Sequence, residues 1–291
     1  MAYDPLRIQL TTQHLDYLVA IDEHPTWAQA AMSCGVSASA LSQGLAELER
    51  RIGVPLFDRV GRSRVLTSGA AEVLSYAKRV VAQTHDLQRW ADATKEGEVG
   101  DLRVGMIDVA AISHFPKQLR EFRSRFPSVD LRLSVSGSSS LADKLGAGVL
   151  DLAVIVEPMT PIEGLVVTEL LSEPLAVYAP DGQEHRKPAD WGPWVTFPAT
   201  SHSRAWIRQE LAALGADFEV VAESHQPEVL SEMVKLGMGW TVLPVSQAET
   251  GLTPLVRARQ RPLLKRQLVV ARREGALPHP GVDQLLSLLT N

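Results

Sequence analysis

Residues 26–48, TWAQAAMSCGVSASALSQGLAEL, predict two short helices joined by a tight turn. Thr26 is followed three residues later by Gln29, a spacing that lets a hydroxyl and an amide cap the first helix. Gly35 lies where a left-handed residue would end that helix, and Ser37 can cap the next one. The stretch therefore indicates a helix-turn-helix unit.

The second helix of this unit has one apolar and one polar face. Leu41, Leu45 and Leu48 recur at steps of four and three, so they face the core. Short hydrogen-bonding side chains then point outward, where they suit the base edges of a DNA major groove. An ordinary helical hairpin with a polar outer face explains these residues equally well. The candidate DNA-contacting residues are Thr26, Ala38, Ser39, Ser42 and Gln43.

Residues 55–69, PLFDRVGRSRVLTSG, predict a hairpin that follows the helix pair directly. Gly61 lies at its tip, and Arg59, Arg62 and Arg64 surround it. Guanidinium groups at this place can bind phosphates and fix the position on a duplex without reading sequence. We interpret the hairpin as the wing of a DNA-binding domain rather than as a solvated turn.

The segments HLDYLVAIDEHPTWAQAA, VSASALSQGLAELERRIGVPLFDR and GRSRVLTSGA together resemble the N-terminal domain of the LysR-type transcriptional regulators. The family order is continuous over residues 12–70. The resemblance implies a winged helix-turn-helix over residues 1–67 that binds double-stranded promoter DNA. Ala38 and Ser39 stand where the family often has Gln and Pro, and Gln43 where Arg is also common, which bears on the operator that is read.

The charge balance does not by itself indicate nucleic acid. The chain has 29 Lys and Arg against 34 Asp and Glu, a net charge of −5. Positive charge is instead clustered, mostly in arginines between positions 50 and 64. One such domain should bind DNA weakly, because affinity grows with the number of neutralised phosphates. Several copies are therefore expected on one DNA site.

Residues 68–97 predict one long helix, because no Pro occurs there and Gly occurs only near its ends. Such a helix is roughly 40 Å long, which exceeds what its own small domain can bury. A solvated spacer is the alternative, but the family uses this linker helix to dimerise and commonly assembles into tetramers. The predicted dimerisation seam repeats at steps of four and three and comprises Val73, Ala77, Val80, Thr84, Leu87, Ala91 and Thr94.

Residues 98–291 alternate strand and helix patterns, which predicts an α/β domain with a largely parallel sheet. The last apolar strand, residues 267–271, and a final helix are expected to return to the first lobe. We therefore predict two lobes with a ligand cleft between them. Lobe I covers residues 98–171 and 267–291 approximately, and lobe II residues 172–266.

The segments LREFRSRFPSVDL, LGAGVLDLAVI and LSEMVKLGMGWTVLP resemble the effector-binding domain of the same family, a fold akin to periplasmic binding proteins. The resemblance implies an effector between the lobes, where helix N-termini would favour an anionic group. Carried over by position, the candidate effector-contacting residues are Asp108, Val109, Ser136, Ser138, Ser139, His202, Arg204 and His225.

Two of these positions leave alternatives open. Asp108 and Val109 stand where the family often has a Pro and a hydroxyl residue, so Asp108 is either a helix N-cap or a selector for an effector amine. His202 and Arg204 could bind a carboxylate or could equally be surface residues. The identity of the effector is not contained in the sequence.

Enzymatic signatures are absent from the sequence. There is no CxxC, HExxH or P-loop motif, and no GxGxxG after a strand. Ser201, His202 and Ser203 are adjacent and lack a nucleophile elbow, so a hydrolase triad is not expected. Cys34, the single cysteine, excludes an intrachain disulfide and is expected to be a small buried hydrophobe. We expect no enzyme, no cofactor and no metal site.

Residues 1–15 lack the apolar segment of a secretory signal, and no run is long enough to span a membrane. We therefore expect a cytoplasmic homodimer or homotetramer that binds promoter DNA in response to a small-molecule effector, with RNA polymerase as a further candidate partner. The alternatives are a cytosolic solute-binding receptor without a DNA role and an enzyme on the two-lobed fold.

Overall fold

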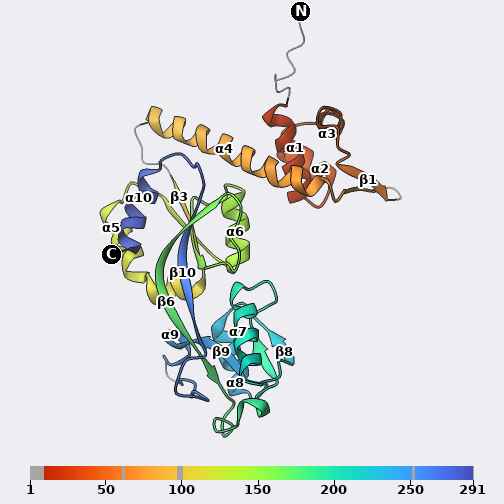
Figure 1. Cartoon of the computed structure of the whole chain (residues 1–291). Coiled ribbons are helices and arrows are strands. Elements are labelled where there is room, and N and C mark those ends of the chain that lie inside the picture. The colour runs from red at the N-terminus through yellow and green to blue at the C-terminus, as the bar shows by residue number, and fades with distance from the viewer. Residues whose placement is uncertain (1–9, 61–62, 97–100, 251–252, 291) are drawn as a thin grey trace, which may run out of the picture. The chain divides into compact units, whose positions relative to one another are not determined.

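The computed structural model forms two compact units, Met1–Asp92 with Gly146–Gly148, and Ala93–Leu145 with Val149–Asn291 (Figure 1). It describes residues 10–60, 63–96, 101–250 and 253–290; for 59–60, 63–64 and 92–96 it describes the backbone alone. Across those residues, no helix combines the length and apolar character needed to cross a membrane.

The first unit is a winged helix-turn-helix, as the sequence predicts. Its buried apolar residues form one core, in which Leu18, Leu41, Leu45 and Leu48 are completely buried. Its elements are α1 (Thr12–Glu23), α2 (Trp27–Ser33), α3 (Ala38–Ile52), β1 (Phe57–Val60), β2 (Ser63–Leu66) and α4 (Ala70–Glu96).

The predicted turn and the two hydroxyl caps lie where the sequence puts them, but the predicted amide cap by Gln29 is not formed. Thr26 Oγ1 accepts a hydrogen bond from the backbone N–H of Gln29 at 3.2 Å and donates to Gln29 Oε1 at 3.0 Å. The amide side chain thus meets the hydroxyl. Gly35 adopts φ 67°, which ends α2, and Ser37 Oγ accepts from Ala40 N at 3.2 Å at the start of α3.

A glycine lets α3 approach α1 closely. A Cβ atom at Gly44 would lie 2.7 Å from two ring carbons of Tyr17 on α1, well inside van der Waals contact. The Tyr17 side chain is itself buried, so its ring has little room to move. The crossing of the two helices therefore depends on the missing side chain at position 44.

The prediction for α4 is correct in length and partly wrong in the position of its apolar seam. Ala77 is buried in the core of its own winged domain, and Val73 and Val80 pack against the same core. The apolar side chains that remain largely exposed are Tyr76, Leu87 and Trp90. The predicted and observed seams differ because the first turns of α4 pack onto the winged domain. The periodicity of the sequence does not reveal this packing.

The second unit consists of two lobes linked by long strands. Its elements are β3 (Leu102–Met106), η1 (Ala110–His114), α5 (Pro116–Arg125), β4 (Leu131–Val135), α6 (Ser138–Gly146), β5 (Leu152–Val156), β6 (Leu165–Tyr178), η2 (Pro188–Asp190), β7 (Trp194–Thr196), α7 (His202–Ala213), β8 (Val220–Glu223), α8 (Pro227–Lys235), β9 (Thr241–Pro244), α9 (Val245–Ala248), β10 (Leu264–Arg273) and α10 (Pro280–Leu289).

The expectation of a largely parallel sheet is wrong. The six-stranded sheet has the order β4-β3-β5-β10-β6-β9, in which β3 pairs in parallel with β4 and β5 and the remaining pairs are antiparallel. The separate pair β7 and β8 in lobe II is parallel. Strand β10 runs antiparallel to both β5 and β6, and β6 runs antiparallel to β9. The reason is that β6 and β10 cross between the lobes in opposite directions and lie side by side through both (Figure 1).

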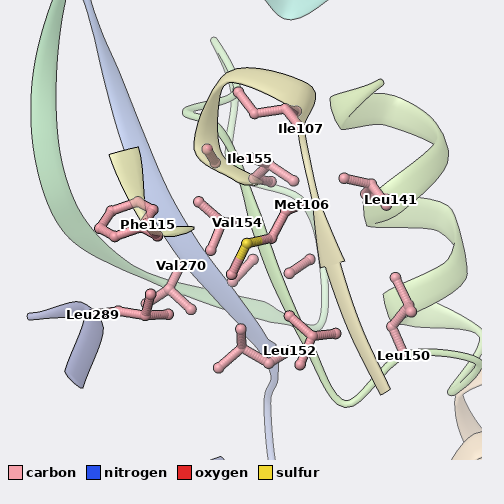
Figure 2. Close-up of a cluster of buried hydrophobic side chains, with 14 of the residues drawn as sticks. Met106, Ile107, Phe115, Leu141, Leu150, Leu152, Val154, Ile155, Val270 and Leu289 are labelled. Carbon is pink, nitrogen blue, oxygen red and sulfur yellow. The ribbon is translucent and has the colours of Figure 1, made fainter. Parts of the chain in front are cut away.

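Each lobe has its own hydrophobic core. The core of lobe I brings together side chains from different elements (Figure 2). They include Met106 from β3, Phe115 from the loop before α5, Leu141 from α6 and Val270 from β10. In lobe II the corresponding cluster is built around the fully buried Trp194 and Trp240. The cores include residues from both β6 and β10, so the crossing strands tie the lobes together.

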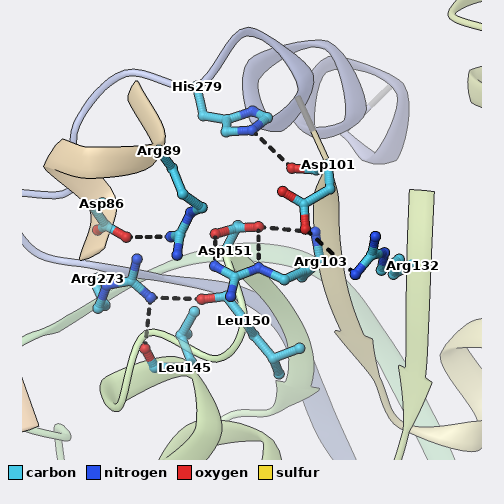
Figure 3. Close-up of polar contacts among 10 residues, drawn as sticks. All are labelled: Asp86, Arg89, Asp101, Arg103, Arg132, Leu145, Leu150, Asp151, Arg273 and His279. Carbon is cyan, nitrogen blue, oxygen red and sulfur yellow. Dashed lines mark hydrogen bonds and ion pairs between the residues drawn. The ribbon is translucent and has the colours of Figure 1, made fainter. Parts of the chain in front are cut away.

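Polar contacts fix the ends of the lobe I strands. Arg273 Nη1 at the end of β10 donates to the carbonyl oxygens of Leu145 and Leu150 at 2.8 and 2.6 Å (Figure 3). Arg103 on β3 pairs with Asp151 before β5, with Nη2 2.7 Å from Oδ1. These charge-assisted bonds satisfy the carbonyl groups at the end of α6 and hold β3 beside β5.

We predict that Gly44→Ala destabilises the winged domain, because the new methyl group overlaps the buried Tyr17 ring. Overpacking of this kind costs about 1–3 kcal/mol. Urea unfolding followed by circular dichroism measures it. The control is Gly146→Ala, where a Cβ atom meets nothing within 4 Å. Equal unfolding midpoints for the two variants would contradict the close crossing.

Candidate functional site

The first candidate site is the outer face of α3 together with the start of α2. Ala38, Ser39 and Gln43 are exposed, Ser42 is half-buried and Thr26 is exposed. On α3, Ser39 and Gln43 lie opposite Leu41, Leu45 and Leu48, whereas Thr26 caps the start of α2. The face therefore presents the hydroxyl and amide groups that base edges can bond.

Hydrogen bonds already occupy two polar groups on this face. The hydroxyl groups of Ser37 and Ser39 lie 2.9 Å apart. Glu47 bonds to Arg50 and Arg51, whose guanidinium groups hold the pKa of that carboxyl at about 2. Glu47 is thus ionised and engaged with two of the nearby cations.

The predicted phosphate-binding wing is described only in part. Arg62 lies outside the described residues, and the side chains of Arg59 and Arg64 do as well, although their backbones pair across β1 and β2. Sequence reasoning missed Glu49, whose Oε1 accepts from the N–H groups of Leu56 and Phe57 at 2.7 and 3.2 Å. This carboxylate anchors the wing to the end of α3.

The second candidate site is the seam where the two lobes meet. Ser139 on lobe I donates to the carbonyl oxygen of Thr200 on lobe II at 2.5 Å. His202 Nδ1 on lobe II lies 2.9 Å from the carbonyl oxygen of Val156 on lobe I. Gly137 of lobe I faces His225, since a Cβ atom there would lie 3.0 Å from the ring. Three predicted effector residues therefore meet across the seam.

Ser138 and Ser136 belong to the same wall of lobe I. Ser138 is buried, and its hydroxyl accepts from the N–H of Val156 at 3.1 Å. The backbone N–H of Ser136 donates to the carbonyl oxygen of Met106 at 3.3 Å. Both residues thus hold the turn before α6 against the ends of β3 and β5.

Asp108 lies at the end of β3 with one engaged and one unengaged oxygen. Its Oδ1 accepts from the N–H of Val109 at 2.7 Å, whereas Oδ2 is buried without a hydrogen-bond partner. Burial raises the pKa of Asp108 to about 6, and the nearby carboxylates of Glu228 and Glu173 act in the same direction. Asp108 bonds its own neighbour's amide, so the predicted N-cap geometry for η1 is not formed.

Two predicted effector residues are engaged elsewhere. The Val109 side chain is completely buried in the core of lobe I, so only its backbone can contact a ligand. Arg204 pairs with Glu223 and donates to the carbonyl oxygen of Phe197 at 3.2 Å, and both partners belong to lobe II. Binding of a carboxylate by Arg204 would require it to leave these partners.

Sequence reasoning also missed two buried charged residues between the lobe cores, Glu173 on β6 and Arg266 on β10. They are 1% and 7% exposed and face each other in the strand register. The sequence did not single them out, because β6 also carries Glu169 and β10 carries several other basic residues. Pairing them required the strand order, because they are 93 positions apart in sequence.

Comparison with known families accounts for nearly the whole chain. Residues 95–291 match the family model described as LysR substrate binding domain. Residues 12–75 match the model described as bacterial regulatory helix-turn-helix protein, lysR family.

Individual relatives extend over similar lengths. The HTH-type transcriptional regulator IlvR of Caulobacter vibrioides is 27% identical over 94% of this chain and 95% of its own length. The activator IlvY of Salmonella typhimurium is 26% identical over 91% and 94%.

Solved structures have the same fold. ArgP of Mycobacterium tuberculosis aligns with a TM-score of 0.68 at 20% identity, covering 97% of each chain. Full-length CbnR in complex with its target DNA aligns with a TM-score of 0.60 at 18% identity, covering 96% of this chain and 99% of CbnR.

We predict that Asp108 makes stability depend on pH. Its pKa in the folded protein, about 6, lies above the ordinary 3.8, so the folded state favours the protonated acid. The stabilisation is complete below about pH 3.8 and is lost as pH rises through about 6, by about 3 kcal/mol at most. Asp108→Asn, which does not titrate, should therefore gain stability relative to the wild type over this range. The measurement is urea unfolding of both proteins at several pH values. If the free energies of unfolding of the wild type and Asp108→Asn changed in parallel with pH, the raised pKa of Asp108 would be contradicted.

Proposed function

The chain belongs to the LysR family of bacterial transcriptional regulators, and from this membership we propose how its two candidate sites work. The protein is a DNA-binding regulator with an effector-binding domain. The alternative of a solute receptor without a DNA role is set aside by the match of residues 12–75 to the family's helix-turn-helix. Because its relatives are named as regulators, we propose that it acts by binding rather than by catalysis, in the cytoplasm.

We propose that the exposed face of α3 reads the operator. The observation that supports this role is the exposure of Ala38, Ser39 and Gln43 on the helix whose opposite face fills the core. Thr26 and Ser42 lie beside them, and we propose that Arg59, Arg62 and Arg64 bind phosphates. Phosphate contacts would set position, and the α3 side chains would set sequence preference.

We propose that the effector binds at the seam between the lobes. Ser139, His202 and His225 reach the seam from both sides, and Asp108 at the end of β3 has one buried oxygen, Oδ2, without a hydrogen-bond partner. A ligand there can change the protein only by binding one lobe arrangement better than another. Contacts to the backbone of Val109 and to Ser136 and Ser138 would complete the lobe I wall.

We further propose that two copies associate through α4. Tyr76, Leu87 and Trp90 are large side chains that are between 48% and 57% exposed on this helix. Large exposed apolar side chains on a 27-residue helix suit a helical dimer interface. Dimerisation would also double the number of phosphates contacted, which the modest positive charge of one domain requires.

We predict that Gln43→Ala relaxes the sequence preference of the protein. Loss of a bidentate amide contact to a base costs about 1–3 kcal/mol at the position it reads. The measurement is sequencing of the genomic fragments retained by the wild-type and variant proteins. Gln209→Ala, an exposed glutamine on α7, is the matched control and should retain the wild-type fragments. An unchanged motif for Gln43→Ala would show that another face reads the operator.

We predict that Leu87→Glu combined with Trp90→Glu breaks the dimer, because both charges would have to be buried in the interface without partners. Sedimentation velocity at micromolar concentration measures the assembly, and DNA affinity should fall with it. Leu236→Glu, at a side chain 75% exposed on lobe II, is the control and should remain dimeric. A wild-type chain that sediments as a monomer would contradict dimerisation through α4.

A further inference from the structure

A buried group of polar side chains lies between the two lobe cores. Glu173 on β6 and Arg266 on β10 are its centre, with Arg266 Nε 2.8 Å from Glu173 Oε2 and Nη2 2.6 Å from the same oxygen. The core of lobe I includes Leu268 on β10, and that of lobe II begins at Leu175 on β6. The ion pair therefore occupies the short segment that belongs to neither core.

The ion pair is bonded to both lobes. From lobe I, His114 Nε2 at the end of η1 lies 2.6 Å from Glu173 Oε1. From lobe II, Ser203 Oγ near the start of α7 accepts from Arg266 Nη1 at 2.8 Å, and Ser246 Oγ on α9 donates to Glu173 Oε1 at 3.1 Å. One carboxylate and one guanidinium thus connect five elements.

These bonds reach both walls of the proposed effector cleft. His114 ends the short helix that follows Asp108 and Val109, and Ser203 is the neighbour of His202. Burial alone would raise the pKa of Glu173, but its hydrogen bond with His114 and the charge of Arg266 lower it, so the carboxylate is ionised. A buried ion pair is costly unless its remaining bonding groups are satisfied, and here partners from both lobes satisfy them.

We propose that Glu173 and Arg266 are positioning residues that fix the two walls of the effector cleft relative to each other through His114, Ser203 and Ser246. They support the binding residues from behind rather than read the operator. This role depends on the proposed effector cleft, so its test measures only the placement of the two lobes and needs no effector. A negative result for lobe placement would therefore leave effector binding at the seam unaffected.

The test measures the distance between the lobes in the full-length protein by double electron–electron resonance. Spin labels are attached at Ser124→Cys on α5 and Gln209→Cys on α7, both exposed, after Cys34→Ser removes the native cysteine. Excess unlabelled protein keeps labelled chains apart in any dimer. The wild type should give one narrow distance.

Two variants separate positioning from stability. Glu173→Met with Arg266→Met removes both charges and should keep the protein folded, because an apolar pair of similar size commonly replaces a buried ion pair without loss. Ser203→Ala removes only the bond to α7. Both variants should lose the single narrow distance while the double variant retains the wild-type thermal midpoint.

The matched control is Glu249→Gln, which disturbs an ion pair with Arg257 that lies wholly within lobe II. It should keep the narrow distance. A folded double variant with the wild-type distance distribution would overturn the proposal, as would equal broadening in Glu249→Gln. Should the double variant fail to fold, Ser203→Ala decides alone, and a wild-type distribution in that variant overturns the proposal.

Discussion

The antiparallel pairing of β6 with β10 is the interaction on which the effector domain depends. The register runs from Leu175 opposite Leu264 to Leu165 opposite Arg273, with one irregularity at Leu268 and Val269. Because the same two strands contribute to both cores, neither lobe can form its core without bringing the other beside it. The start of α6 and the end of β5 are thereby placed opposite the start of α7, which creates the seam.

Polar groups at this seam have a physical reason to be there. A continuous apolar core would join the lobes into one rigid body, whereas backbone groups at strand and helix ends need hydrogen-bond partners. Ser139 and His202 supply such bonds across the seam, and Glu173 with Arg266 supplies them beneath it. Bonds of this kind are directional, so they favour particular lobe arrangements that a ligand can select.

The fold class could be predicted from sequence because its signals are local. Capping residues such as Thr26 and the leucine spacing of α3 act within one helix, and the structure confirms both. Contacts between distant segments could not be predicted in this way, because local periodicity does not contain them. Three features depend on such contacts: the directions of the crossing strands, the burial of Ala77 on its own domain, and the pairing of Glu173 with Arg266.

Effector binding at the seam between the lobes can be tested directly. The direct measurement is hydrogen exchange of the full-length protein with and without a ligand found by thermal stabilisation among amino acids and organic acids. If the ligand binds at the seam, amide exchange will slow in residues 107–109, 137–139 and 200–203 and stay unchanged in α3. Slowing confined to the groove of about 200 Å³ between α8 and α9, which Glu228 and Gln247 line, would contradict it.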